Sequence, residues 1–188
     1  FTLGLILFNT AVLTAQDQED LEPVFSLARG FYSDPFDLRI TTADQNPIQY
    51  TLDGSDPRTS PAAQRAHTPF LLKIDPLDFS QRDRSPAVIV RAARADQPLA
   101  KVGTHTYLFV DEIRHLSPDG QAPGPLWASP DNKGQRIDYG LDPEIVNDVR
   151  YSDQIEEAFL AIPTFSISTA SENIFSKEMG IYLNATKR

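Results

Sequence analysis

The sequence predicts an all-β protein built from two packed sheets. Between about residues 23 and 111, apolar side chains alternate with polar ones at a period of two, as in strands with one buried face. Turn-forming sequences separate these segments, and the 15 prolines of the 188-residue chain disfavour long helices. Short alternating strands joined by such turns are typical of sandwiches. We therefore predict an immunoglobulin-like or fibronectin-III-like β-sandwich.

The strands follow from the alternation, taken in order along the chain. In the first, Phe36, Leu38 and Ile40 share one face, and Asp37 and Arg39 lie on the other. Turn sequences at residues 44–47, 53–57 and 95–98 separate the later strands. One face of each strand supplies the predicted core, which consists of Phe36, Leu38, Ile40, Tyr50, Leu52, Phe70, Leu72, Val88, Val90, Tyr107 and Phe109.

The turn Asp53-Gly54-Ser55-Asp56-Pro57 is the sharpest local motif. Glycine permits a positive φ, the Asp and Ser side chains cap nearby backbone amides, and Pro57 fixes the exit. Oxygens from Asp53, Ser55 and Asp56 would also suit calcium, but their spacing does not follow the calcium-loop pattern. We favour a structural turn and expect no metal or cofactor here.

The N-terminal segment Phe1–Ala15 is almost entirely apolar and uncharged. It is shorter than the roughly 20 residues that a membrane-spanning helix needs. Its abrupt change to the polar, acidic residues 16–20 is typical of a signal peptide, so residues 1–15 are interpreted as a signal-peptide remnant. The alternative is a buried first strand or helix. The signal interpretation predicts an extracytoplasmic protein, either secreted or on the cell surface.

Composition excludes several classes of site. The net charge of −9 and the pI near 4.7 argue against nucleic acid or an anionic membrane as partner. The chain has no cysteine, which excludes disulfides, thiolate metal sites and cysteine nucleophiles. His67, His105 and His115 occur singly, without the spacing of metal ligands or a catalytic triad.

Residues 112–159 are predicted to form an irregular linker with short helices, because prolines and glycines interrupt any pattern. One helix begins at Asp142-Pro143-Glu144, with Asp142 as N-cap. Another covers residues 152–160, with Asp153 and Glu156 as a candidate capping box. Trp127 and Tyr139 are candidates for a ligand-stacking site for sugars. The alternative, which we favour, is that both rings pin the linker onto a neighbouring domain.

Residues 22–111 resemble the fibronectin-III-associated domain found at the C-terminus of chitobiase and β-hexosaminidase. The motifs that carry the resemblance are Ile48-Gln49-Tyr50-Thr51-Leu52-Asp53-Gly54-Ser55-Asp56-Pro57, Val90-Arg91-Ala92 and Thr106-Tyr107-Leu108-Phe109-Val110. The resemblance implies only a β-sandwich accessory module of the kind attached to exported enzymes, and the motif itself points to no particular ligand.

Residues 160–188 resemble the entry into the spore-coat-protein-H (CotH) kinase-like family. The matching segments are Ile162-Pro163-Thr164, Glu172-Asn173-Ile174-Phe175 and Gly180-Ile181-Tyr182-Leu183-Asn184, preceded by Asp138-Tyr139-Gly140-Leu141-Asp142. This resemblance implies the first strands of a truncated α+β domain. Some members of the family are atypical protein kinases, but the residues that carry their chemistry would lie downstream of residue 188.

Together these features predict a non-catalytic accessory or scaffolding module, the N-terminal fragment of an exported CotH-family protein. Its expected partners are its own downstream CotH-like domain and cell-surface or polysaccharide components. We expect no enzyme activity, no catalytic residues and no cofactor in this fragment, and no membrane span. The alternatives are the N-terminal part of an extracytoplasmic atypical protein kinase, which would be a phosphotransferase, and a carbohydrate-binding module.

Overall fold

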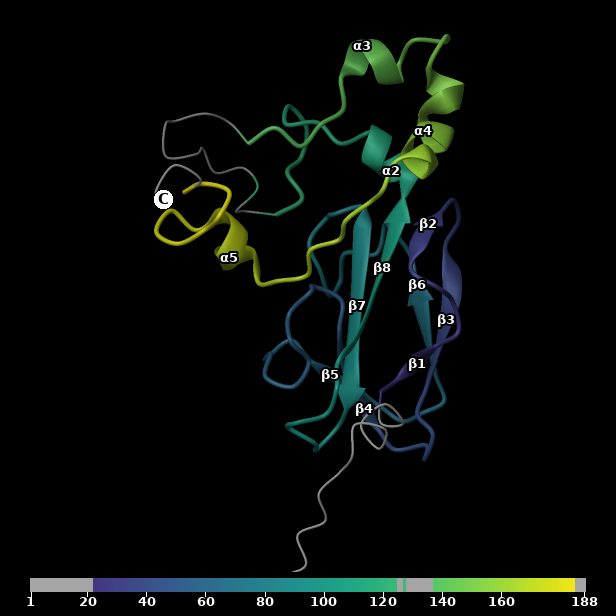
Figure 1. Cartoon of the computed structure of the whole chain (residues 1–188), viewed down its shortest axis with the longest axis vertical. Coiled ribbons are helices and arrows are strands. Elements are labelled where there is room, and N and C mark those ends of the chain that lie inside the picture. The colour runs from purple at the N-terminus through teal and green to yellow at the C-terminus, as the bar shows by residue number, and fades with distance from the viewer. Residues whose placement is uncertain (1–21, 125–126, 128–136, 185–188) are drawn as a thin grey trace, which may run out of the picture.

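The computed structural model of this chain describes residues 22–124, 127 and 137–184. The predicted signal-peptide remnant, residues 1–15, lies outside the described residues. No helix in the described ranges is long and apolar enough to cross a membrane. The described part is mostly strands, arranged in two sheets, with a few short helices (Figure 1).

Within the described ranges, eight strands form the two sheets. The three-stranded sheet has the order β1-β3-β6 and the five-stranded sheet the order β2-β8-β7-β4-β5. The strand bounds are β1 Val24–Phe25, β2 Gly30–Tyr32, β3 Phe36–Thr41, β4 Ile48–Thr51, β5 Gln64–Ala66, β6 Phe70–Ile74, β7 Ala87–Arg94 and β8 Gly103–Phe109. All the strand pairs are antiparallel except β2 with β8, which is parallel. The all-β prediction is confirmed at this level.

Both sheets contribute to one hydrophobic core. Eight of the eleven residues of the predicted core are buried in it, and Leu38, Ile40, Val90 and Tyr107 are fully buried. The other three, Phe36, Leu52 and Phe70, are partly buried and pack against the cluster. Ile48, Ile74 and Ala92 complete the buried set. The period-two alternation therefore identified the buried face of each of the longer strands.

The helices occupy the part of the chain after the sandwich. Helix α2 (Val110–Arg114) continues directly from β8, α3 is Pro143–Val146, and a 3₁₀ turn η1 (Ser152–Gln154) leads into α4 (Ile155–Ala161). As predicted, Asp142 caps α3 by accepting a hydrogen bond from the Glu144 amide at 2.9 Å. The predicted capping box of Asp153 and Glu156 does not form, because the helical turn starts earlier, at η1.

The chain after α4 differs from the prediction. Residues 162–170 are extended but do not pair as a strand, and they are followed by α5 (Ser171–Phe175) and turns to residue 184. The expected first strands of an α+β domain are therefore absent from the described residues 160–184. The alternating residues after Ile162 lack a neighbouring strand, and alternation alone does not make a ladder. This segment instead runs back along the five-stranded sheet (Figure 1).

Candidate functional site

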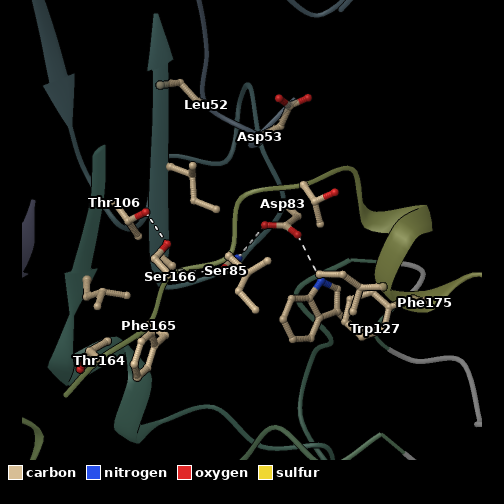
Figure 2. A pocket seen from close by; sticks show the side chains of 16 residues that line it. Leu52, Asp53, Asp83, Ser85, Thr106, Trp127, Thr164, Phe165, Ser166 and Phe175 are labelled. Atoms are coloured by element: carbon tan, nitrogen blue, oxygen red, sulfur yellow. Dashed lines mark hydrogen bonds between the residues drawn. The ribbon is translucent and has the colours of Figure 1, made fainter. Parts of the chain in front are cut away.

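A cleft of about 250 Å³ lies between the outer face of the five-stranded sheet and the segment that follows α4. Three parts of the chain form its walls. One is the sheet, with Ile89 and Leu108; the second is the segment from Thr164 to Phe175; the third is Trp127 of the linker. We call it the Trp127 cleft. Figure 2 shows the side chains that line it.

The Asp53 turn forms one edge of this cleft. Gly54 has a φ of +79°, so the predicted positive φ is confirmed. The Asp53 carboxylate accepts hydrogen bonds from the Ser55 amide at 3.0 Å and from the Ser55 hydroxyl at 2.5 Å. The Gly54 carbonyl accepts from Arg91 at 3.1 Å. The turn is thus stabilised by hydrogen bonds from its own side chains and from β7.

Within the same turn, the Asp56 carboxylate forms an ion pair with the Arg58 guanidinium, with their nearest atoms 2.6 Å apart. The hydrogen bond from the Arg58 side chain lowers the pKa of the Asp56 carboxyl from 3.8 to about 2. This carboxylate therefore stays ionised until strongly acidic pH. Its role is to hold the chain after the turn, with the Arg58 amide also donating to it at 3.0 Å.

The loop before β7 forms a second edge. Arg82 donates hydrogen bonds to backbone carbonyls on both sides of the loop, including Pro76 at 2.7 Å and Asp83 at 3.0 Å. Burial lowers the pKa of the Arg82 guanidinium. These bonds fix the loop so that the neighbouring Asp83 faces the linker. One Asp83 oxygen accepts from the Ser85 amide at 3.1 Å, and the other accepts from the Trp127 indole at 3.2 Å (Figure 2).

The segment after α4 covers the sheet through two side-chain hydrogen bonds. The hydroxyls of Ser166 and Thr106 lie 2.6 Å apart, and the Ser168 hydroxyl donates to the Gly54 carbonyl at 3.2 Å. Phe165 and Ile167 alternate with these serines and are 87% and 67% exposed. The serine hydroxyls therefore attach the segment to the sheet and the Asp53 turn, and Phe165 and Ile167 line the cleft while staying largely exposed.

The structure brings the two predicted stacking residues together. The rings of Trp127 and Tyr139 lie 5.6 Å apart, edge to face, and Phe175 packs against Trp127 at 4.9 Å. Ile137, Phe175 and Leu183 form the buried centre of this second hydrophobic cluster. We call it the linker cluster. Both interpretations of the two rings, pinning of the linker onto a neighbouring domain and stacking of a sugar, stay predictions.

The Trp127 cleft offers carboxylates and hydroxyls but no cation among its described lining residues. The Asp53 oxygen that faces Ser55 and both oxygens of Asp83 are engaged in hydrogen bonds within the protein. No group of three or more His, Asp or Glu side chains suited to a metal ion occurs in the part of the chain that the structure describes. The hydrogen bonds at this cleft attach the linker and the segment after α4 to the sandwich.

Sequence reasoning missed the residues that make these attachments. Asp83 lies in a polar loop, and Thr106 and Ser166 lie on alternating segments where hydroxyls are common. The one available signal was the regular placement of Ser166 and Ser168 on one side of an extended segment. Their partners are 60 and 114 residues distant in the sequence, so no local pattern identifies them.

We compared the chain with protein-family models, curated proteins and solved structures, and none of the three comparisons found a match. The resemblances to the chitobiase-associated domain and to the CotH family therefore stay predictions.

Proposed function

We propose that this chain is a non-catalytic scaffolding module, in which a sandwich of the immunoglobulin or fibronectin-III type holds the linker and the segment after it in one orientation. In this proposal the protein acts outside the cytoplasm, as an accessory part of an exported CotH-like protein. The order of the strands and the shared core between the sheets support the sandwich type.

The observation that carries the proposal is that β8 and two loops beside the five-stranded sheet hold the chain's own later segments. Asp83 binds Trp127, Thr106 binds Ser166, and Gly54 binds Ser168. An outer sheet face needs no such cover for the sandwich to fold, because one face of an antiparallel sheet can meet water. These three hydrogen bonds therefore fix the position of the attached segments on the sandwich.

Two experiments, a phosphate-transfer assay and a binding titration, separate the proposal from its alternatives. Incubation of the purified chain with radiolabelled ATP and Mg²⁺ or Mn²⁺ should give no phosphate transfer above that of a heat-denatured sample. Calorimetric titration with chitin oligosaccharides should give no saturable heat. Metal-dependent transfer would favour the phosphotransferase alternative. Saturable binding that is lost in Trp127→Ala would favour a carbohydrate-binding module.

A further inference from the structure

The segment after α4 has a backbone without hydrogen-bond partners at the surface of the protein. Residues 162–170 are extended, yet within the described part of the chain the N–H and C=O groups of residues 164–168 form no hydrogen bond. The hydroxyls of Ser166 and Ser168 attach the segment instead. We call residues 162–169 the extended segment.

These free backbone groups define what can bind here. An extended chain presents the N–H and C=O groups of alternate residues to the same edge, and another extended chain pairs with them in a regular ladder. Exposed strand edges are usually protected by charges or by proline. Residues 164–169 contain neither, and their Thr, Phe and Ile side chains favour strands. The extended segment is therefore an open edge for the addition of a strand.

One edge of the extended segment borders the Trp127 cleft. Residues 164–167 line the cleft along one side, and Trp127 and Phe175 lie across from them (Figure 2). Between these walls the sheet contributes Ile89 and Leu108. A strand added at this edge would lie over the cleft and direct alternate side chains into it. Apolar side chains suit this position, because Ile89 and Leu108 are apolar.

The other face of the added strand would meet the exposed side of the extended segment. Phe165 is 87% exposed and Ile167 67%. β-branched or aromatic residues directly opposite them would form the cross-strand pairs that stabilise sheets. The added strand therefore also covers apolar surface that otherwise meets water.

The charges at the cleft are negative. Asp53 and Asp83 line it, and no Lys or Arg is among its described lining residues. Both hydrogen bonds that Ser55 donates to Asp53 end on Oδ1, so Oδ2 of this exposed carboxylate is available. A Lys or Arg at one end of the added strand would pair with it.

The position of the extended segment decides between a second copy of this chain and another protein. Two antiparallel copies of the segment would pair about a two-fold axis perpendicular to their ribbon, so both five-stranded sheets would lie on the same side of it. Paired strands are about 4.8 Å apart. Ser166 is attached to β8, which has β2 and β7 on its two sides, so two sheets this close would collide.

We propose that the extended segment binds an extended segment of a partner protein by strand addition over the Trp127 cleft. The partner segment has a neutral centre of β-branched or aromatic residues and a Lys or Arg at one end. This inference rests on the proposed scaffolding function, because the sandwich must hold the extended segment in place for its edge to be available. It adds the class of partner that the Trp127 cleft takes.

The test uses the full chain and a synthetic peptide of about nine residues, longer than a typical strand, with alternating Val and Thr and a Lys at each end. Two control peptides carry N-methyl groups, one on the Val amides and the other on the Thr amides. Alternate amides point to opposite edges of a strand, so each set of methyl groups blocks one edge. Ile167→Ser removes a cross-strand contact. Ile181→Ser is its matched control, since the two isoleucines are 67% and 65% exposed and only Ile167 lines the cleft.

Fluorescence anisotropy should show that the unmodified peptide and one methylated peptide bind. The other methylated peptide should bind at least about tenfold more weakly, because it cannot form the backbone hydrogen bonds. Ile167→Ser should weaken binding about threefold to fivefold, and Ile181→Ser should bind like the parent chain. Asp53→Asn, which keeps an oxygen for the Ser55 bonds, should reduce the salt dependence of binding. Amide exchange of alternate residues in 164–168 should slow at least about tenfold.

Several results would overturn the proposal. These are no binding at about 1 mM peptide, equal binding of the two methylated peptides, equal weakening by Ile167→Ser and Ile181→Ser, or unchanged amide exchange in residues 164–168. Self-association of the parent chain in sedimentation, abolished by Ile167→Ser, would make the occupant a second copy. If residues 171–184 of the free chain are held in place as the scaffolding function predicts, any of these results contradicts strand addition alone.

Discussion

The indole nitrogen of Trp127 donates a hydrogen bond to the Asp83 carboxylate, 3.2 Å away, and so connects the linker cluster to the sandwich. Asp83 is oriented for this bond by its own loop, which Arg82 holds through backbone carbonyls. Trp127 is the only tryptophan in the chain. Its fluorescence therefore reports on the linker cluster, whereas far-ultraviolet circular dichroism reports mainly on the strands.

This difference allows the two parts to be followed separately during unfolding. Among the residues that the structure describes, the linker cluster has three buried members and the sandwich core has eleven. A smaller buried cluster opens at a lower free energy. We expect the Trp127 fluorescence transition in urea to precede the circular dichroism transition. Coincident transitions would mean that linker and sandwich unfold as one cooperative unit.

Truncation of a core residue should lower the free energy of unfolding by an amount that increases with the burial of that residue. Val90 is fully buried between its neighbours, so Val90→Ala should lower the free energy of unfolding by about 2 to 3 kcal/mol. Leu52 is only partly buried and also lines the Trp127 cleft, so Leu52→Ala should cost less, about 1 to 2 kcal/mol. Urea denaturation followed by circular dichroism measures both. Equal costs at the two positions would contradict the burial that the structure assigns.

The Asp53 turn predicts a specific penalty at Gly54. Its φ of +79° is unfavourable for β-branched residues, so Gly54→Val should destabilise the fold by more than about 1 kcal/mol. Space is not the cause, because an added Cβ would lie 3.5 Å from the Ser168 hydroxyl, an ordinary contact. Gly54→Asn is the matched control, since asparagine tolerates positive φ better. If both variants melt alike, the backbone conformation is not what limits this position.

The Asp56–Arg58 pair predicts a dependence of stability on pH. The folded-state pKa of Asp56, about 2, lies below its ordinary value of 3.8. The pair therefore stabilises the folded state above about pH 4, and this contribution is lost as the pH falls through 2. After screening by solvent it is on the order of 1 kcal/mol. Denaturant midpoints measured between pH 2 and pH 6 should converge for the parent and Asp56→Asn at the acid end. If the difference between the two midpoints stays the same across this pH range, the Asp56–Arg58 pair does not cause the dependence of stability on pH.

The sandwich core was predictable because its determinants are local. Leu38 and Ile40 alternate with the polar residues Asp37 and Arg39, and this alternation identifies their buried face. Strands β1, β2 and β5 have two or three residues each, too few for an alternation to be recognised. The parallel pairing of β2 with β8 joins residues more than 70 positions apart, which only the folded chain specifies.

The candidate site was less predictable. Residues 162–169 alternate like a strand, but the structure gives them side-chain hydrogen bonds to the sheet in place of a ladder. Trp127 and Tyr139 were recognised by residue type alone. That Phe175 and Leu183 complete their cluster depends on how the chain returns after α4. Sequence patterns specify which face of an element is buried, but they do not specify which distant segment covers it.

The central claim is that the sandwich holds the linker and the later segment in place. The most direct measurement is hydrogen–deuterium exchange on Asp83→Asn with Thr106→Val, a pair of nearly isosteric substitutions. They weaken the bond to Trp127 and remove the bond to Ser166, and they leave the strand pairs intact. We predict exchange at least about tenfold faster than in the parent across residues 171–184, with β7 and β8 unchanged. Unchanged exchange in residues 171–184 would contradict the claim.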